Sequence, residues 1–171
     1  YLADQDFWRL SGISRDVYVY SREKKRLEDI NVVASASGEA KLHADVSKGV
    51  TAVSFEITDP AGTNVVSVKV PVVKNVAEAV VNVPDVKLWS AETPWLYTLN
   101  VASFDKKGQT EAASIQIGFR DVCIKDGQLL VNGQPVLIKG ANRHEMNPYK
   151  GYVVSEADMI QDIQIMKRLN I

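Results

Sequence analysis

Seven short runs rich in valine, isoleucine, threonine and aromatic residues succeed one another between Glu28 and about Phe119, with no helical stretch between them. Turn-forming pairs such as Ser37-Gly38 and Lys48-Gly49 separate the runs. Short alternating runs at this spacing are typical of two antiparallel sheets packed face to face. The sequence therefore predicts a mainly β fold with an immunoglobulin-like β-sandwich. The predicted strands span residues 30–36, 41–46, 52–58, 65–70, 76–83, 96–104 and 113–118.

Residues 84–94 connect the fifth and sixth predicted strands. This connection is too long, and too bounded by proline, for a tight hairpin. Trp89 lies within it and Trp95 directly after it. We expect both rings to pin the connection to the edge of the sandwich, and this structural role is favoured over contact with a ligand.

The N-terminal segment joins a strand pattern to a dense mixture of side chains. Alternation over residues 16–20 predicts a strand with one buried face. One interpretation of the preceding residues is a surface loop anchored by Trp8, with Arg9 or Arg15 paired with a carboxylate. The other is the rim of a binding site, because an aromatic ring and a nearby carboxylate can stack on and hydrogen-bond a sugar. The acidic, aromatic and arginine side chains concerned are Asp4, Asp6, Phe7, Trp8 and Arg9.

The pattern changes from Arg120 onward to short apolar runs. The pairs Asp126-Gly127 and Asn132-Gly133 separate these runs and predict successive tight hairpins. The apolar residues 136–138 then predict a buried strand that ends at Gly140.

A capped helix is predicted near the end of the chain. Ser155 and Asp158 occupy the N-cap and N3 positions of a capping-box pattern. Apolar residues follow at the spacing of one helical face, at Met159, Ile160, Ile163, Met166 and Leu169. Together with the strand at 136–138 and the polar loop between them, this helix predicts one βα unit, of the kind that begins either a barrel or an open α/β sheet.

His144 is the strongest candidate for chemistry, because it lies in the polar loop just after the predicted strand. In a (β/α)₈ barrel, functional residues lie at the C-terminal ends of strands. A histidine there can hydrogen-bond a substrate hydroxyl or orient a carboxylate. A histidine that caps loop carbonyls is an equally supported alternative. Glycoside hydrolysis needs two facing carboxylates, and the sequence identifies no partner for the neighbouring Glu145.

Several function classes are disfavoured by composition. The formal net charge is −1, from 20 basic and 21 acidic side chains, so we expect no nucleic-acid or anionic membrane partner. No apolar run approaches the roughly 20 residues of a membrane helix. The two histidines lie far apart and no HExxH motif or cysteine cluster occurs, so no metal site is predicted from the residues alone. We expect His43 to face solvent in a sandwich strand, and Cys123 to be a buried structural thiol.

Three stretches together resemble the β-galactosidases of glycoside hydrolase family 2. They are YLADQDFWRLSGISRDVYVYSR at 1–22, LWSAETPWLYTL at 88–99 and GFRDVCIKDGQLLVNGQPVLIKGANRHEMNPYKG at 118–151. Members of that family have a sugar-binding jelly roll, then an immunoglobulin-like sandwich, then a catalytic (β/α)₈ barrel. The resemblance implies that residues 1–22 are the C-terminal tail of the jelly roll. It likewise implies that residues 23–120 form the sandwich and residues 121–171 begin the TIM barrel.

The resemblance also implies roles for two residues. Asp6, in QDFW, corresponds to a carboxylate that contacts galactosyl hydroxyls and a monovalent cation. His144, in NRHE, corresponds to the histidine that contacts the galactosyl group in the transition state. Met146-Asn147 depart from the family pattern, which often has histidine at these positions, so no substrate detail is carried over to that part of the loop. For cofactors, Na⁺ and Mg²⁺ are implied for the full-length protein and none for this chain alone.

A fragment of a retaining β-galactosidase is therefore the favoured interpretation, with a β-galactoside as substrate and a homo-oligomeric full-length protein. The family's acid/base and nucleophilic glutamates lie beyond Ile171, so we expect this chain alone to be inactive and structural. A β-glucuronidase has the same layout but fits the QDFWRLSG stretch less well. A stand-alone sandwich that binds carbohydrate or protein is the alternative class, and an amphipathic helix without a partner argues against it. Because the chain begins at Tyr1 without methionine, we expect the true N-terminus to be missing, and cytoplasmic and periplasmic locations both stay open.

Overall fold

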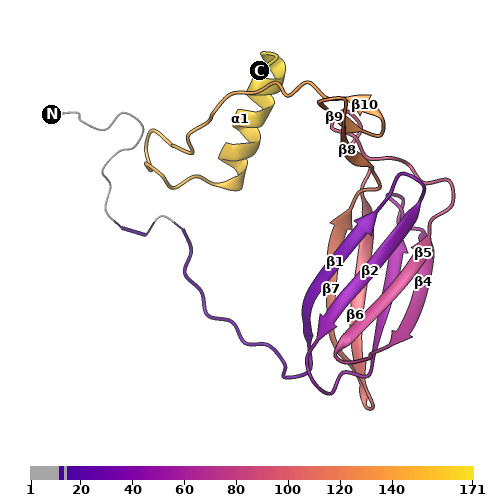
Figure 1. The fold of residues 1–171 in the computed structure, drawn as a ribbon. Helices are drawn as coiled ribbons and strands as arrows, with labels where there is room; N and C mark the ends of the chain where they lie inside the picture. Colours follow the sequence, from indigo (N-terminus) through magenta and orange to yellow (C-terminus); the bar gives the residue numbers. More distant parts are fainter. Residues whose placement is uncertain (1–11, 14) are drawn as a thin grey trace. The chain divides into compact units, whose positions relative to one another are not determined.

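The computed structural model describes residues 12, 13 and 15–171 of the chain (Figure 1). The chain divides into two compact units. The larger unit, Ser21–Val136, holds every strand that the structure describes. The smaller unit combines Tyr1–Tyr20 with Leu137–Ile171 and holds the helix.

Two antiparallel sheets form a sandwich in the larger unit. The first contains, in order, β1 (Leu27–Ala34), β2 (Glu39–Val46) and β5 (Val76–Asn82). The second contains, in order, β4 (Asn64–Pro71), β3 (Ala52–Thr58), β6 (Tyr97–Asp105) and β7 (Gly108–Ile117). Each strand overlaps one of the seven predicted runs. The prediction of a mainly β chain with an immunoglobulin-like sandwich is confirmed.

The core of the sandwich follows from the two-residue alternation of its strands, which turns every second side chain inward. Val53, Phe55 and Ile57 of β3 are fully buried, and so are Leu99 and Val101 of the paired strand β6. The other sheet contributes its own buried residues to the same cluster, Leu27, Ala40, Leu42, Ala44, Val46 and Ala77. Burial of one large apolar side chain stabilises the fold by about 1.5–3 kcal/mol.

Two tight hairpins follow the sandwich, as predicted. They join β8 (Val122–Lys125), β9 (Gln128–Val131) and β10 (Gln134–Pro135) into a small antiparallel sheet. Asp126 and Gly127 have φ of +51° and +73°, and Asn132 and Gly133 have +51° and +76°. Two successive positive φ angles are the requirement of the type I′ turn, which explains why these dipeptides occur here.

Trp89 pins the 84–94 connection to the sandwich edge, as predicted. The backbone N–H of Trp89 donates to the carbonyl of Phe119 at 2.9 Å, and the side-chain amide of Asn132 donates to the carbonyl of Trp89 at 3.0 Å. The guanidinium of Arg120 lies 4.4 Å from the ring centroid. A Cβ at Gly118 would lie 2.9 Å from the Cβ of Trp89, so this approach requires a glycine.

Two predicted strands do not form. Residues 16–20 have no strand conformation, and Val19 is 100% exposed. Residues 136–138 are likewise irregular, and Ile138 is 82% exposed. A strand requires a paired neighbour for its backbone groups. Val136 still donates to the Leu129 carbonyl at 2.9 Å, but no strand pairs with residues 16–20 or 137–138 among the described residues. The predictions of buried strands at these two places were wrong.

Cys123 is also placed differently from the prediction. It lies on β8, all four residues of which are exposed, and its thiol is free. The alternating run around it indicated a strand correctly. The run could not reveal that neither face of this small sheet is buried.

The helix α1 (Glu156–Arg168) begins as predicted. Ser155 is its N-cap, and the Ser155 hydroxyl accepts a hydrogen bond from the Asp158 N–H at 3.2 Å. The Asp158 carboxylate accepts in return from the Ser155 N–H at 2.9 Å. The hydrogen bonds that the N–H and the hydroxyl of Ser155 donate to the carboxylate hold the pKa of Asp158 below its usual value. Among the described residues no helix is long and apolar enough to span a membrane.

Candidate functional site

The loop between residue 139 and the start of α1 carries the sequence-predicted histidine, and side-chain hydrogen bonds shape it. The Asn147 side-chain oxygen accepts from the N–H groups of Tyr149 and Lys150, at 2.9 and 3.1 Å. Asn147 and Gly151 exchange two backbone hydrogen bonds, at 2.7 and 2.9 Å. Asn147, one of the two departures from the family pattern, therefore closes the tip of this loop.

Arg143 fastens the loop to the helix. Its Nε lies 3.0 Å from Oδ2 of Asp162, on α1, and its Nη2 donates to the same oxygen. The Arg143 side chain is 23% exposed, so this contact is partly shielded from water. The residue directly before His144 is thus held in place from the helix side.

Glu145 fastens the loop on its other side. Its Oε2 accepts from Nη2 of Arg15 at 2.5 Å, and Nη1 of Arg15 donates to the Tyr152 carbonyl at 3.1 Å. Its Oε1 lies 3.9 Å from Nη1 of Arg143. The sequence suggested that Arg9 or Arg15 pairs with a carboxylate, and Arg15 does so. The carboxylate is 130 residues away in sequence, and no local pattern could have identified it.

His144 lies between these two fastened residues and is exposed. The N–H of Met146 donates to its carbonyl at 3.1 Å, which makes a tight turn directly after it. An exposed imidazole on a held backbone can donate one hydrogen bond to a ligand and accept another. Asp6, the other predicted site residue, lies outside the described residues, so the structure does not place it relative to His144.

The carboxylates near His144 are engaged in ion pairs. Within residues 12–13 and 15–171, no three histidine, cysteine or carboxylate side chains gather as metal ligands. Glu145 and Asp162 each have an arginine as counter-ion. Asp6, the only residue assigned to a cation by the resemblance, is not described.

His43 lies on the outer sheet face, but it is more enclosed than predicted. Its Nδ1 lies 3.1 Å from Oε1 of Glu78, and its Nε2 lies 3.2 Å from Oδ1 of Asp45. The hydrogen bond with Glu78 is the main cause that raises the pKa of His43 above its ordinary value. Both ring nitrogens are occupied, so this cluster is a structural one.

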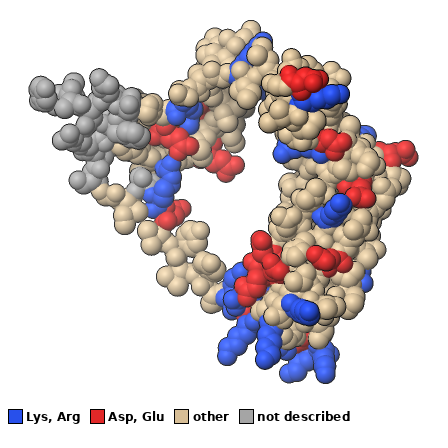
Figure 2. Space-filling view, in the orientation of Figure 1, with Lys and Arg blue, Asp and Glu red and all other residues tan. Residues whose placement is uncertain are grey.

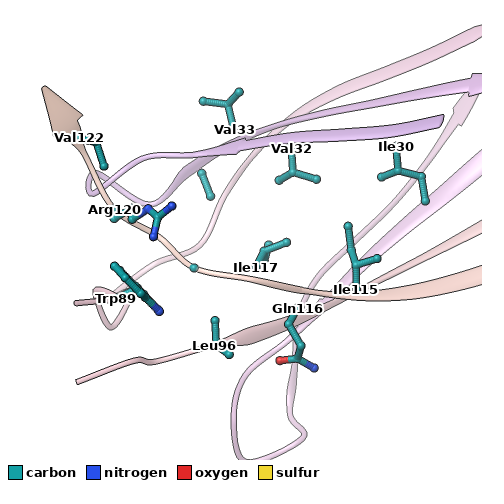
Figure 3. A pocket seen from close by; sticks show the side chains of 12 residues that line it. Ile30, Val32, Val33, Trp89, Leu96, Ile115, Gln116, Ile117, Arg120 and Val122 are labelled. Carbon is teal, nitrogen blue, oxygen red and sulfur yellow. The ribbon is translucent and has the colours of Figure 1, made fainter. Parts of the chain in front are cut away.

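A cavity of about 600 Å³ opens between β1 and β7 in the larger unit (Figure 3). Ile30 and Ile115 line one end, and Trp89 and Arg120 lie at the other. The lining has no histidine and no carboxylate. It therefore offers apolar contact but no group for acid, base or nucleophilic chemistry.

Lysine and arginine side chains gather at one end of the sandwich (Figure 2). A second cavity of about 600 Å³ there is lined by Lys24, Lys25 and Lys107 together with Glu23 and Asp105. Nζ of Lys25 lies 2.6 Å from Oδ2 of Asp105, so part of the positive charge is already neutralised. The His144 loop thus stays the best candidate site among the described residues.

Comparison with known families matches two sequence models to the chain. Residues 13–120 match the family described as "Glycosyl hydrolases family 2". Residues 122–171 match the one described as "Glycosyl hydrolases family 2, TIM barrel domain".

The relatives found by sequence are far longer than this chain. A "Beta-galactosidase" from Photobacterium profundum is 36% identical over 191 residues, which is 99% of this chain and 18% of that protein. One from Lactobacillus delbrueckii subsp. bulgaricus is 35% identical over 178 residues, 100% of this chain and 18% of that protein. One from Actinobacillus pleuropneumoniae is 37% identical over 177 residues, 100% of this chain and 16% of that protein. The chain spans less than a fifth of the length of these relatives.

Solved structures of similar fold include two β-glucuronidases. The Faecalibacterium prausnitzii enzyme has a TM-score of 0.79 and 24% identity, and covers 95% of this chain and 26% of that one. The Bifidobacterium dentium enzyme, complexed with coumarin-3-O-glucuronide, has a TM-score of 0.74 and 22% identity over 84% of this chain and 26% of that one. At these identities the likeness establishes the fold alone.

Proposed function

The chain belongs to glycosyl hydrolase family 2, and from this membership we propose that its full-length protein is a retaining β-galactosidase. Such an enzyme hydrolyses terminal β-D-galactosyl residues through a glycosyl-enzyme intermediate. The observation that carries the proposal is identity of 35–37% to proteins named β-galactosidase over essentially the whole chain. A homo-oligomeric full-length protein is part of the same proposal.

We assign the parts of the chain by the same family layout. Residues 1–22 would end the jelly roll, 23–120 would form the sandwich, and 121–171 would begin the barrel. The family matches, which meet between residues 120 and 122, support the second boundary. In a barrel the loop after the first strand opens at the catalytic face. By this layout residues 136–138 would be that strand in the full-length protein, and the His144 loop would open at that face.

His144 and Asp6 are proposed as the substrate contacts of this chain. His144 would donate a hydrogen bond to a galactosyl hydroxyl, a bond that strengthens as the sugar ring flattens toward an oxocarbenium ion. Asp6 would accept hydrogen bonds from galactosyl hydroxyls. It would also be one ligand of Na⁺, a cation that supplies a fixed positive charge beside the sugar. No residue of this chain is assigned to Mg²⁺.

A β-glucuronidase is the second candidate, because the two solved structures of similar fold described above have that activity in their names. The two substrates differ at C6, where a glucuronide carries a carboxylate and a galactoside a hydroxymethyl group, and in the configuration of the hydroxyl at C4. The full-length protein should therefore be assayed with chromogenic β-D-galactoside and β-D-glucuronide under the same conditions. Hydrolysis of the galactoside with little of the glucuronide is expected, and the opposite preference would replace the proposal by its rival.

A further inference from the structure

We propose that Arg15 and Asp162 are positioning residues for His144, acting through Glu145 and Arg143. These four residues form what we call the ion-pair bracket. The inference rests on the proposed role of His144 as a galactosyl contact. It goes beyond that role because it names groups that touch no sugar and still govern the reaction.

The bracket holds the backbone on both sides of His144. Arg143, directly before it, donates from Nε and Nη2 to Asp162 on α1. Glu145, directly after it, accepts from Arg15 in the N-terminal segment. With both neighbours fastened, the Cα of His144 has little freedom to shift. The two fastening points come from opposite ends of the chain, at residues 15 and 162.

Arg15 makes its two contacts from two different nitrogens of one guanidinium. Its Nη2 reaches Glu145 at 2.5 Å while its Nη1 reaches the Tyr152 carbonyl at 3.1 Å. The planar guanidinium presents donors at fixed angles, whereas an ammonium is a single point charge. One arginine therefore ties the residue after His144 to the far end of the same loop.

The charges of the bracket alternate and balance. Glu145 Oε1 lies 3.9 Å from Nη1 of Arg143, which links the two ion pairs into one network. The four side chains are between 23% and 59% exposed, so the pairs add little to overall stability. Their effect should appear in the placement of His144, because a shift of about 1 Å in a positioned group can lower a rate roughly 100-fold.

Kinetics of the full-length protein provide the first test, with Arg15→Met and Asp162→Asn. Each variant should lower kcat on a β-galactoside about 10-fold or more and change KM less than about threefold. The melting temperature should stay close to that of the wild type. Arg15→Lys, which keeps the charge, should recover part of the loss. Lys125→Met removes one positive charge from the exposed strand β8 and should leave kcat unchanged.

A double-variant cycle shows whether Arg15 acts through Glu145. Arg15→Met combined with Glu145→Gln should lower kcat no further than the more damaging single change. Additive losses would mean that Arg15 acts by another route, and would overturn the proposal. A kcat for Arg15→Met equal to that for Lys125→Met would overturn it as well.

Amide exchange in the 171-residue chain separates this inference from the proposed function. Amides 142–147 should exchange about 10-fold faster in Arg15→Met than in the wild type or Lys125→Met. If the full-length protein hydrolyses no β-galactoside, the proposed function fails, and the exchange result alone decides whether the bracket exists. Unchanged exchange in Arg15→Met would overturn the bracket whatever the enzyme hydrolyses.

Discussion

The contacts of His43 make the stability of the fold depend on pH. On β2 it lies between Asn31 of β1 and Glu78 of β5, and Asp45 is two residues further along its own strand. Glu78 and Asp45 each contact one ring nitrogen. Two further charged residues lie on these strands, Asp29 on β1 and Lys41 on β2, and Asp29 lies opposite Asp45. The carboxylates that contact the ring favour the protonated imidazole, which is why the pKa of His43 is raised.

The sign of the resulting pH dependence follows from this direction. The pKa of His43 is higher in the folded state than in the unfolded state, where it is near 6.5. The stabilisation from its protonated ring is therefore complete below the unfolded-state pKa and is lost as the pH rises through the folded-state pKa. Thermal unfolding of the chain should therefore show that wild type loses stability relative to His43→Gln as the pH rises above about 6.5. Parallel curves for the two proteins would show that the carboxylate contacts do not couple to folding.

Glu111 of β7 ties the segment before β1 to the other sheet. Its carboxylate accepts from Nε and Nη2 of Arg22, at 2.9 and 2.8 Å, and from the Leu27 N–H at 2.7 Å. Glu111→Gln should cost about 1–3 kcal/mol in the free energy of unfolding at neutral pH, because these donors lose a charged acceptor. Denaturant unfolding measures this, with Glu56→Gln on β3 as the matched control. Equal stability of the two variants would contradict this role.

Glu111 also makes the stability of the fold depend on pH in the acidic range. Arg22 is the main cause that holds the pKa of Glu111 below its ordinary value. The ionised Glu111 carboxylate therefore stabilises the fold fully above its unfolded-state pKa, near 4.5. This stabilisation is lost as the pH falls through the lower pKa of the folded state. The cost of Glu111→Gln should therefore shrink as the pH is lowered below about 4.

At the scale of elements, the sandwich is held by side chains that meet between its sheets. Phe119, two residues after the end of β7, is fully buried and packs edge-on against Tyr97 of β6, with ring centroids 5.1 Å apart. Phe119→Ala should cost about 3–5 kcal/mol, through lost burial and the cavity left behind. Val80→Ala, at a side chain 66% exposed on β5, should cost less than about 0.5 kcal/mol. A similar denaturation midpoint for both variants would place the core elsewhere.

The elements that could be predicted from sequence are those whose pattern is local. Alternation and turn dipeptides located the seven sandwich strands and the hairpins, and the Ser155 and Asp158 spacing located the start of α1. Residues 16–20 and 136–138 carry strand patterns, but among the described residues no strand pairs with 16–20 or with 137–138, and no local pattern can reveal this. The contact of Arg15 with Glu145 was inaccessible for the same reason. The candidate histidine was predictable, whereas the network that holds it was not.

At the scale of the whole molecule, this chain spans 16–18% of the length of the β-galactosidases described above. Retaining hydrolysis requires two carboxylates about 5–5.5 Å apart, one of them free to attack the sugar. The carboxylates near His144, those of Glu145 and Asp162, instead form ion pairs with arginines. The 171-residue polypeptide should therefore not hydrolyse a chromogenic β-galactoside. Turnover that follows the polypeptide through purification, and is lost in Glu145→Gln, would refute this.

The proposed role of His144 is open to direct measurement in the full-length protein. A hydrogen bond that improves toward the transition state contributes on the order of 1.5–3 kcal/mol, so His144→Ala should lower kcat/KM roughly 10- to 100-fold. Affinity for D-galactono-1,5-lactone, whose ring is flattened, should fall more than affinity for a thiogalactoside in its ground-state shape. Asp6→Ala should weaken both ligands, because its contacts act throughout the reaction. If His144→Ala leaves the rate and both affinities near wild type, His144 caps its loop and contacts no sugar.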